Sequence, residues 1–186
     1  MPMQRLRIES GERLRVQRRL SYLLCLLLLG AAPPPKVHPV TRVILRPAPG
    51  ALDKQERGDV IIEYTDGSRA RLTNSGMAAA PRLAPDGRTV GYVALRFETY
   101  RSERVLAYAQ IVIFRDGRRL STLQPEKIAE LTWDFRQGGQ QVAVASAGMH
   151  GPTYLQLFDV TTGKQLAVAS GSDDSLPQWA AGLEVR

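Results

Sequence analysis

The clearest strand signal in the sequence is Pro81-Arg82-Leu83-Ala84-Pro85-Asp86-Gly87-Arg88-Thr89-Val90-Gly91-Tyr92. Its centre, Asp86-Gly87, favours a tight turn, because glycine adopts a positive φ without steric cost and aspartate bonds to its own backbone. Apolar residues alternate with other residues after the turn, which is the period-two pattern of a half-buried strand. The stretch therefore predicts two strands joined by a hairpin turn.

The same kind of turn occurs four more times between short apolar runs. These turns contain Asp66-Gly67, Asp116-Gly117, Gly138-Gly139 and Thr162-Gly163. No segment after residue 32 carries a sustained helical period, and Val40 to Arg46 alternates like one further strand. The sequence predicts an all-β fold with five hairpins.

Two independent landmarks recur at one period. The hairpin glycines Gly67, Gly117 and Gly163 are separated by 50 and 46 residues, and so are the large apolar residues Leu83, Trp133 and Trp179. Four short strands over about 45 residues make up one blade of a β-propeller. We predict about three four-stranded antiparallel blades over residues 58–186, in an incomplete or open propeller. The three large apolar side chains are expected to point into the space between blades.

The stretch from Pro81 to Tyr92 resembles the WD-like propeller repeat of TolB and its relatives. Pro85-Asp86-Gly87 is intact, while Leu83 stands where the family has tryptophan and Ala84 where it has serine. The hairpin from Asp66 to Thr73 also resembles the family, with its Asp-Gly turn and Leu-Thr pair. The resemblance covers residues 58–186. It implies a propeller fold in the bacterial envelope and implies little about activity.

The N-terminus has the order of a secretory signal peptide. Six arginines precede the apolar run from Leu20 to Leu29, and Gly30-Ala31-Ala32 lead into three prolines. A membrane-spanning helix needs about 20 apolar residues, more than this run provides. We predict a signal peptide over 1–32, a proline-rich linker and first strand over 33–57, and a periplasmic or secreted protein. Only an uncleaved signal segment would attach it to a membrane.

Composition and motifs argue against several classes of activity. The net charge of +7 lies mostly in residues 1–19, so the mature chain carries only +3, too little for a nucleic-acid interface. No Gly-x-Ser-x-Gly motif occurs, and His38 and His150 are far apart in a chain whose single cysteine is Cys25. We predict no catalytic residue, no metal and no cofactor. The chain is expected not to be an enzyme.

The alternation of tight turns and longer connections suggests where binding takes place. Successive hairpin turns of a blade lie at one end of its sheet and the remaining connections at the other, and loops on a rigid scaffold often carry function. The longer connections are expected at 74–80, 98–104, 124–130, 147–152 and 170–176. Aromatic residues and arginine are enriched at binding hot spots. The candidates for binding are Tyr100, Arg101, Arg104 and His150.

The sequence therefore predicts an exported recognition module that binds a protein or another ligand. The alternative is the non-catalytic propeller portion of a split or truncated peptidase or hydrolase. A propeller needs about four blades or more. We expect either that two chains associate into a six-bladed ring or that the chain is part of a longer propeller, because an open arc would leave two terminal faces uncovered.

Overall fold

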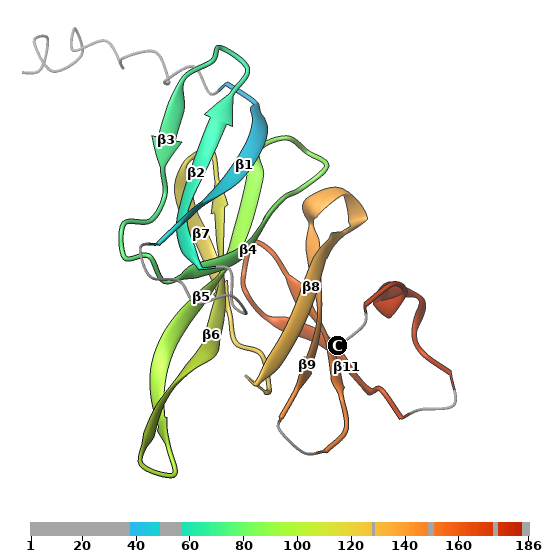
Figure 1. Ribbon diagram of the computed structural model, residues 1–186. Helices are drawn as coiled ribbons and strands as arrows, with labels where there is room; N and C mark the ends of the chain where they lie inside the picture. The colour runs from blue at the N-terminus through green and yellow to red at the C-terminus, as the bar shows by residue number, and fades with distance from the viewer. Residues whose placement is uncertain (1–37, 49–56, 128, 149–150, 173–174, 184–186) are drawn as a thin grey trace, which may run out of the picture. The chain divides into compact units, whose positions relative to one another are not determined.

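The computed structural model describes five stretches of the chain, all of them within Val37–Arg186 (Figure 1). They are residues 38–48, 57–127, 129–148, 151–172 and 175–183. These residues are all-β, with two short 3₁₀ turns and no α-helix, so no helix among them is long and apolar enough to cross a membrane. The predicted signal peptide lies outside the described residues.

Seven antiparallel strands make up the first sheet, in the order β1-β2-β4-β5-β6-β7 with β3 beside β2. They are β1 (Val40–Pro47), β2 (Gly58–Tyr64), β3 (Arg69–Arg71), β4 (Ala78–Leu83), β5 (Thr89–Tyr100), β6 (Glu103–Arg115) and β7 (Arg118–Leu123). A single residue pair, Gly58 with Ala78, joins β2 to β4. The sheet therefore consists of two strand groups, the first group β1–β3 and the second group β4–β7.

Four antiparallel strands in chain order make up the second sheet, which is the third group. They are β8 (Glu130–Arg136), β9 (Gln141–Ala147), β10 (Tyr154–Asp159) and β11 (Gln165–Ser170). The 3₁₀ turn η1 (Gln137–Gly139) joins β8 to β9, and η2 (Gln178–Ala180) follows β11. The second and third groups thus have the same up-and-down order of four strands, which agrees with the predicted repeat.

The five predicted hairpins are confirmed, and contacts hold their turns near one another. Arg88, beside the β4–β5 turn, donates from Nε to Asp116 in the β6–β7 turn at 2.8 Å. The backbone N–H of Val40 donates to Gly87 at 2.7 Å. Gly139 in the β8–β9 turn lies against Ala84. The predicted strand from Val40 is also confirmed, as β1.

The three side chains at the repeated positions each pack in a different apolar cluster. Leu83 on β4 packs against a cluster that contains Val40 and Ile62 of the first group and its own strand partner Val90. Trp133 on β8 lies in a core cluster with Val93, Ile111 and Ile113 of the second group. Trp179 in η2 packs on Ala145 and Leu155 of the third group. One large apolar side chain thus lies on the first strand of the second group, one on the first strand of the third group, and one in the segment that follows the third group.

Trp133 is the best-fitted of the three. Its side chain is 1% exposed, and its indole N–H donates to the carbonyl of Ala80 at 3.2 Å. A Cβ placed on Gly91 would lie 2.6 Å from Cη2 of the indole and 2.9 Å from Cδ1 of Ile113. Atoms at such distances overlap, so only glycine fits at position 91 as the two sheets are packed. The glycine at position 91 is therefore explained by Trp133, which follows 42 positions later in the sequence.

The face of β1–β3 that lies opposite Ile62 is charged. Paired residues on neighbouring strands share a face of a sheet. Arg42 pairs with Glu63, and Glu63 pairs in turn with Arg69, to which it is also ion-paired at 2.7 Å. Asp59 pairs with Arg46 and makes an ion pair with Arg71. This outer face of the first group therefore carries ion pairs around Ile44 and Ile61 instead of an apolar surface.

The fold class is confirmed at the level of an all-β chain with two antiparallel sheets. No closed barrel and no ring of blades is identified in the described residues. One predicted connection is wrong. Residues 98–104 are not a loop, since β5 continues to Tyr100 and β6 begins at Glu103.

Candidate functional site

The β5–β6 hairpin is the part of the described fold best suited to contact a partner. The two strands pair along their whole length, from Thr89 with Arg115 to Tyr100 with Glu103. Pairing with β4 ends at Ala94, and pairing with β7 ends at Ile111. Within the part of the chain that the structure describes, no third strand pairs with residues 95–109, here called the ribbon, and Figure 1 shows them extending past the rest of the sheet.

The end of the ribbon is a two-residue turn of unusual composition. Arg101 has a φ of 48° and Ser102 a φ of 70°. Two successive positive φ values define a type I′ turn, for which Asn-Gly is the preferred sequence. A left-handed conformation costs about 1–2 kcal/mol for a residue with a Cβ atom. The sequence did not indicate this turn because neither residue is glycine, asparagine or aspartate.

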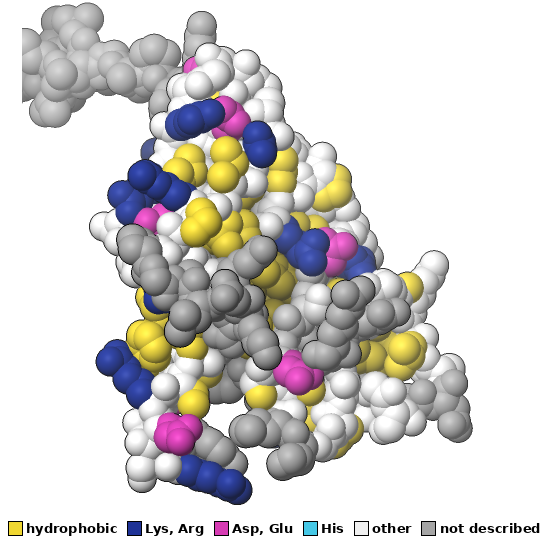
Figure 2. Space-filling model, in the orientation of Figure 1, with side chains coloured by type: hydrophobic (Ala, Val, Ile, Leu, Met, Phe, Trp, Pro, Cys, Tyr) yellow, Lys and Arg dark blue, Asp and Glu magenta, His cyan; other side chains and the backbone are white. Residues whose placement is uncertain are grey.

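One face of the ribbon carries apolar side chains that run from the core outward. Leu95 is buried, and it pairs with Tyr108, which packs on the core cluster. Phe97 pairs with Leu106, and Phe97 is 45% exposed. The guanidinium of Arg104 lies 4.0 Å from the centre of the Phe97 ring. Basic, acidic and hydrophobic side chains gather along the ribbon, at the lower left of Figure 2.

The contact between Arg104 and Phe97 gives the ribbon a defined chemical character. A cation over an aromatic face is attracted by the ring quadrupole, by about 0.5–1 kcal/mol at an exposed site. The planar guanidinium can stack on a ring and still present N–H donors in its own plane. Such a pair combines an apolar contact surface with donors for a carboxylate. Arg96, which pairs with Ala107, makes an ion pair with Glu98 at 2.5 Å.

The predicted binding residues are placed only in part. Arg101 occupies the turn of the ribbon and Arg104 lies on β6 close to it, so the structure brings these two together. Tyr100 is the last residue of β5, but its side chain is outside the described residues, and so is the whole of His150. Phe97 was not predicted. Phe97 belongs to the alternating series Leu95, Phe97 and Thr99, which predicts a strand. Its exposure follows only from the structure, in which the pairing of β5 with β4 ends at Ala94.

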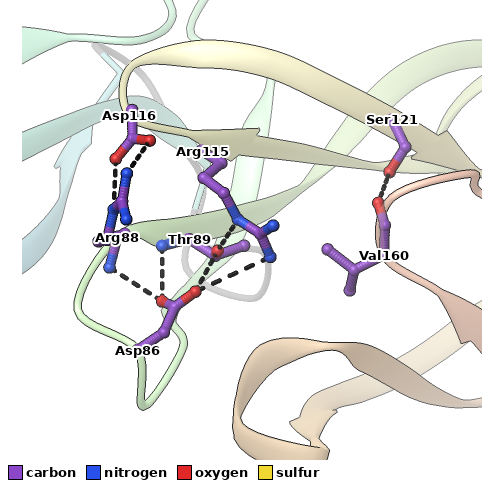
Figure 3. A network of polar contacts seen from close by, with 7 residues as sticks. All are labelled: Asp86, Arg88, Thr89, Arg115, Asp116, Ser121 and Val160. Atoms are coloured by element: carbon purple, nitrogen blue, oxygen red, sulfur yellow. Dashed lines mark hydrogen bonds and ion pairs between the residues drawn. The ribbon is translucent and has the colours of Figure 1, made fainter.

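A second group of polar residues lies at the tight turns, at the other end of β5 (Figure 3). Asp86 accepts hydrogen bonds from the backbone N–H of Arg88 at 2.9 Å, the backbone N–H of Thr89 at 2.8 Å and the Thr89 hydroxyl at 2.6 Å. Arg115 donates from Nε to the Thr89 hydroxyl at 2.9 Å and lies 3.9 Å from Asp86. Arg88 binds both oxygens of Asp116.

This network holds the turns in place, and its polar groups are engaged with one another instead of being available to a ligand. Burial alone would raise the pKa of Asp86, but the hydrogen bonds from Thr89 and Arg88 and the charge of Arg115 outweigh it and lower the pKa. The carboxyl group is therefore ionised at neutral pH and is engaged by its neighbours. Nearby, the Ser121 hydroxyl donates to the carbonyl of Val160 and so ties the second group to the third. These contacts explain a stable rim better than a reactive site.

Neither metal chemistry nor known relatives add to this description. Among the described residues, no group of three His, Cys, Asp or Glu side chains could hold a metal ion. Comparison with known proteins finds no family model, no curated protein and no solved structure that matches the chain. The ribbon and the repeat are therefore the features that bear on function.

Proposed function

We propose that this chain is an exported recognition module of the bacterial envelope, of TolB-like propeller type, that binds a protein partner through the ribbon. In this proposal the chain is not an enzyme and needs no cofactor. Residues 1–32 direct export and are removed. The supporting sequence features are the basic and apolar order of that segment and the resemblance of Pro85-Asp86-Gly87 to the TolB repeat.

The propeller part of the proposal is supported by the repeated strand order. In a propeller each twisted sheet buries its faces against the neighbouring sheets. Leu83, Trp133 and Trp179 make the equivalent contact three times, each on the preceding group of strands. A pair of unrelated sheets would have no reason to reuse one sequence position for these contacts.

The contact between Phe97 and Arg104 is the observation that carries the binding role. Contact between water and a large apolar ring is unfavourable, so burial of the ring in an interface is favourable. Aromatic residues and arginine contribute most of the binding free energy at protein interfaces. Here both lie on the ribbon, which is fixed at its base by Leu95 and whose end pairs with no further strand among the described residues. An arm of this kind can insert into a partner while the rest of the fold stays unchanged.

The test compares two double variants for capture of partners by the mature protein from envelope extract. Phe97→Ala with Arg104→Ala is expected to lose the specific partners, with a change in melting temperature of only a few degrees because exposed substitutions cost little stability. Arg69→Ala with Arg118→Ala, on β3 and β7, removes two exposed side chains away from the ribbon and should keep them. Equal capture by the wild type and the ribbon variant would refute the assignment.

A further inference from the structure

Three outer strands of the fold are equivalent but differ in charge. β3, β7 and β11 each follow a hairpin turn, with glycine at 67, 117 and 163. β3 contains Arg69 and Arg71, and β7 begins with Arg118 and Arg119. β11 reads Gln-Leu-Ala-Val-Ala-Ser and has no charged residue. It is the one of the three that lacks the arginines.

β11 is also exposed and has strand pairing on one side only. It is the last strand of the four-stranded sheet, and among the described residues its only strand neighbour is β10. Leu166 is 49% exposed and Val168 is 59% exposed. An open edge presents unpaired backbone donors and acceptors, and natural proteins usually protect such edges with charged side chains, proline or bulges. The pairing with β10 is irregular only at Leu166, and it is regular from Ala167 to Ser170.

The chemistry of this edge favours one kind of partner. An open row of backbone N–H and C=O groups is satisfied by another strand, and apolar side chains at the seam gain from burial. Antiparallel pairing of a strand with its own copy places like residues near each other, so a charged strand repels itself. Self-pairing of β3 or β7 would bring arginines together, whereas self-pairing of β11 opposes no charges.

We propose that β11 pairs antiparallel with β11 of a second copy of this chain. The two four-stranded sheets then form one eight-stranded sheet across a two-fold axis, with Val168 of each copy at the seam. The contact is isologous, which is the commonest symmetry of soluble homo-oligomers. It uses a sheet edge, and so it is distinct from the ring closure expected from the repeat, which would use the faces of the first and third groups. The ribbon stays free to bind another protein.

Sedimentation velocity of the full chain over a range of concentrations tests this proposal. The wild type should show a monomer–dimer equilibrium, and Val168→Lys should raise the dimer dissociation constant about tenfold or more, since like charges then face each other at the seam. Thr161→Lys is the matched control. It adds the same charge at an exposed position in the preceding turn and should leave the constant unchanged. All three proteins share the same N-terminal segment, so association through that segment cancels in the comparison.

Hydrogen exchange at the β11 amides supplies a second measurement that does not depend on the variants. These amides should exchange more slowly as the wild-type concentration rises, and not in Val168→Lys. A chain that stays monomeric at all concentrations overturns the proposal, as does a dimer that Val168→Lys leaves intact. A dimer lost through Ile44→Lys, on the outer face of the first group, would point to ring closure instead. A monomer whose β11 amides are protected only in envelope extract would assign the edge to another protein.

Discussion

The contact between Gly91 and Trp133 gives the sharpest test of how the sheets are packed. Trp133→Leu replaces the tryptophan with the residue found at the equivalent position, Leu83. Because Trp133 is 1% exposed, its truncation removes a large buried surface. Replacement of a buried tryptophan by alanine costs about 3–5 kcal/mol, and leucine should cost somewhat less, about 2–3 kcal/mol. If this contact forms after the folding transition state, the destabilisation should appear mainly as faster unfolding.

Gly91→Ala perturbs the same contact from the other side. The new Cβ would lie 2.6 Å from the indole ring and 2.9 Å from Ile113, so the sheets must move apart or the ring must turn. Overpacking of this kind costs about 1–3 kcal/mol. The φ of Gly91 is not in the left-handed region, so the backbone itself accepts alanine.

The double variant decides whether the two effects share one cause. With leucine at position 133 the outer ring atoms are gone, and the Cβ added at position 91 occupies part of the space that they leave. We expect the double variant to be more stable than the sum of the single losses predicts, by about 1–2 kcal/mol. Urea unfolding of all four proteins, with equal m values, measures this coupling. Additivity within about 0.5 kcal/mol would refute the packing described here.

Two further predictions concern the polar contacts. The pKa of Asp86 is lowered from its ordinary value of 3.8. The ionised carboxylate therefore stabilises the fold fully at pH values above 3.8, and this stabilisation is lost as the pH falls through the lowered pKa. Asp86→Asn should therefore lower stability at pH 7 and flatten the loss of stability below about pH 4, which acid titration of the melting temperature measures. Arg136 donates to the carbonyls of Trp179 and Ala181. Arg136→Lys, which cannot reproduce the guanidinium fork, should speed hydrogen exchange over residues 178–183, and unchanged exchange there would contradict this role.

The turns and the repeat could be predicted from the sequence because each depends on local chemistry. Glycine at 67, 117 and 163 has a positive φ in the structure, as tight turns require. Leu83 and Trp133 were recognised as equivalent by spacing alone, and their contacts agree. The hydrogen bond from the Trp133 indole to Ala80 could not be predicted, because it depends on an irregularity in β4 where Ala80 has a φ of 43°.

The ribbon could not be predicted because its definition is not local. Alternation from Val93 to Thr99 has the same form whether or not a third strand lies alongside. The arginines were selected by residue type, and the structure places Arg101 and Arg104 together. Phe97 needed the register of β5 against β6, which is shifted between Ala94 and Leu95. A one-residue shift changes which side chains share a face.

The charged outer face of β1–β3 helps to explain how three strand groups stay folded without a partner on that face. The expectation that two chains close a ring depends on how much apolar surface the two terminal faces expose. At the first group, Glu63 with Arg69 and Asp59 with Arg71 occupy that face, so little apolar surface would be gained by covering it. Repeat proteins use terminal repeats with a polar outer face for this purpose.

At the other end, the segment from Gln178 to Leu183 performs a similar task. Trp179 and Leu183 pack on Ala145 and Leu155 of the third group, and Arg136 holds the segment through two backbone carbonyls. Both terminal faces are then covered or polar within the described residues, and ring closure stays a prediction that this packing does not require. Neither the charged face of β1–β3 nor the segment from Gln178 to Leu183 protects the uncharged edge of β11. If the chain associates with itself, physical chemistry therefore favours that edge over the terminal faces.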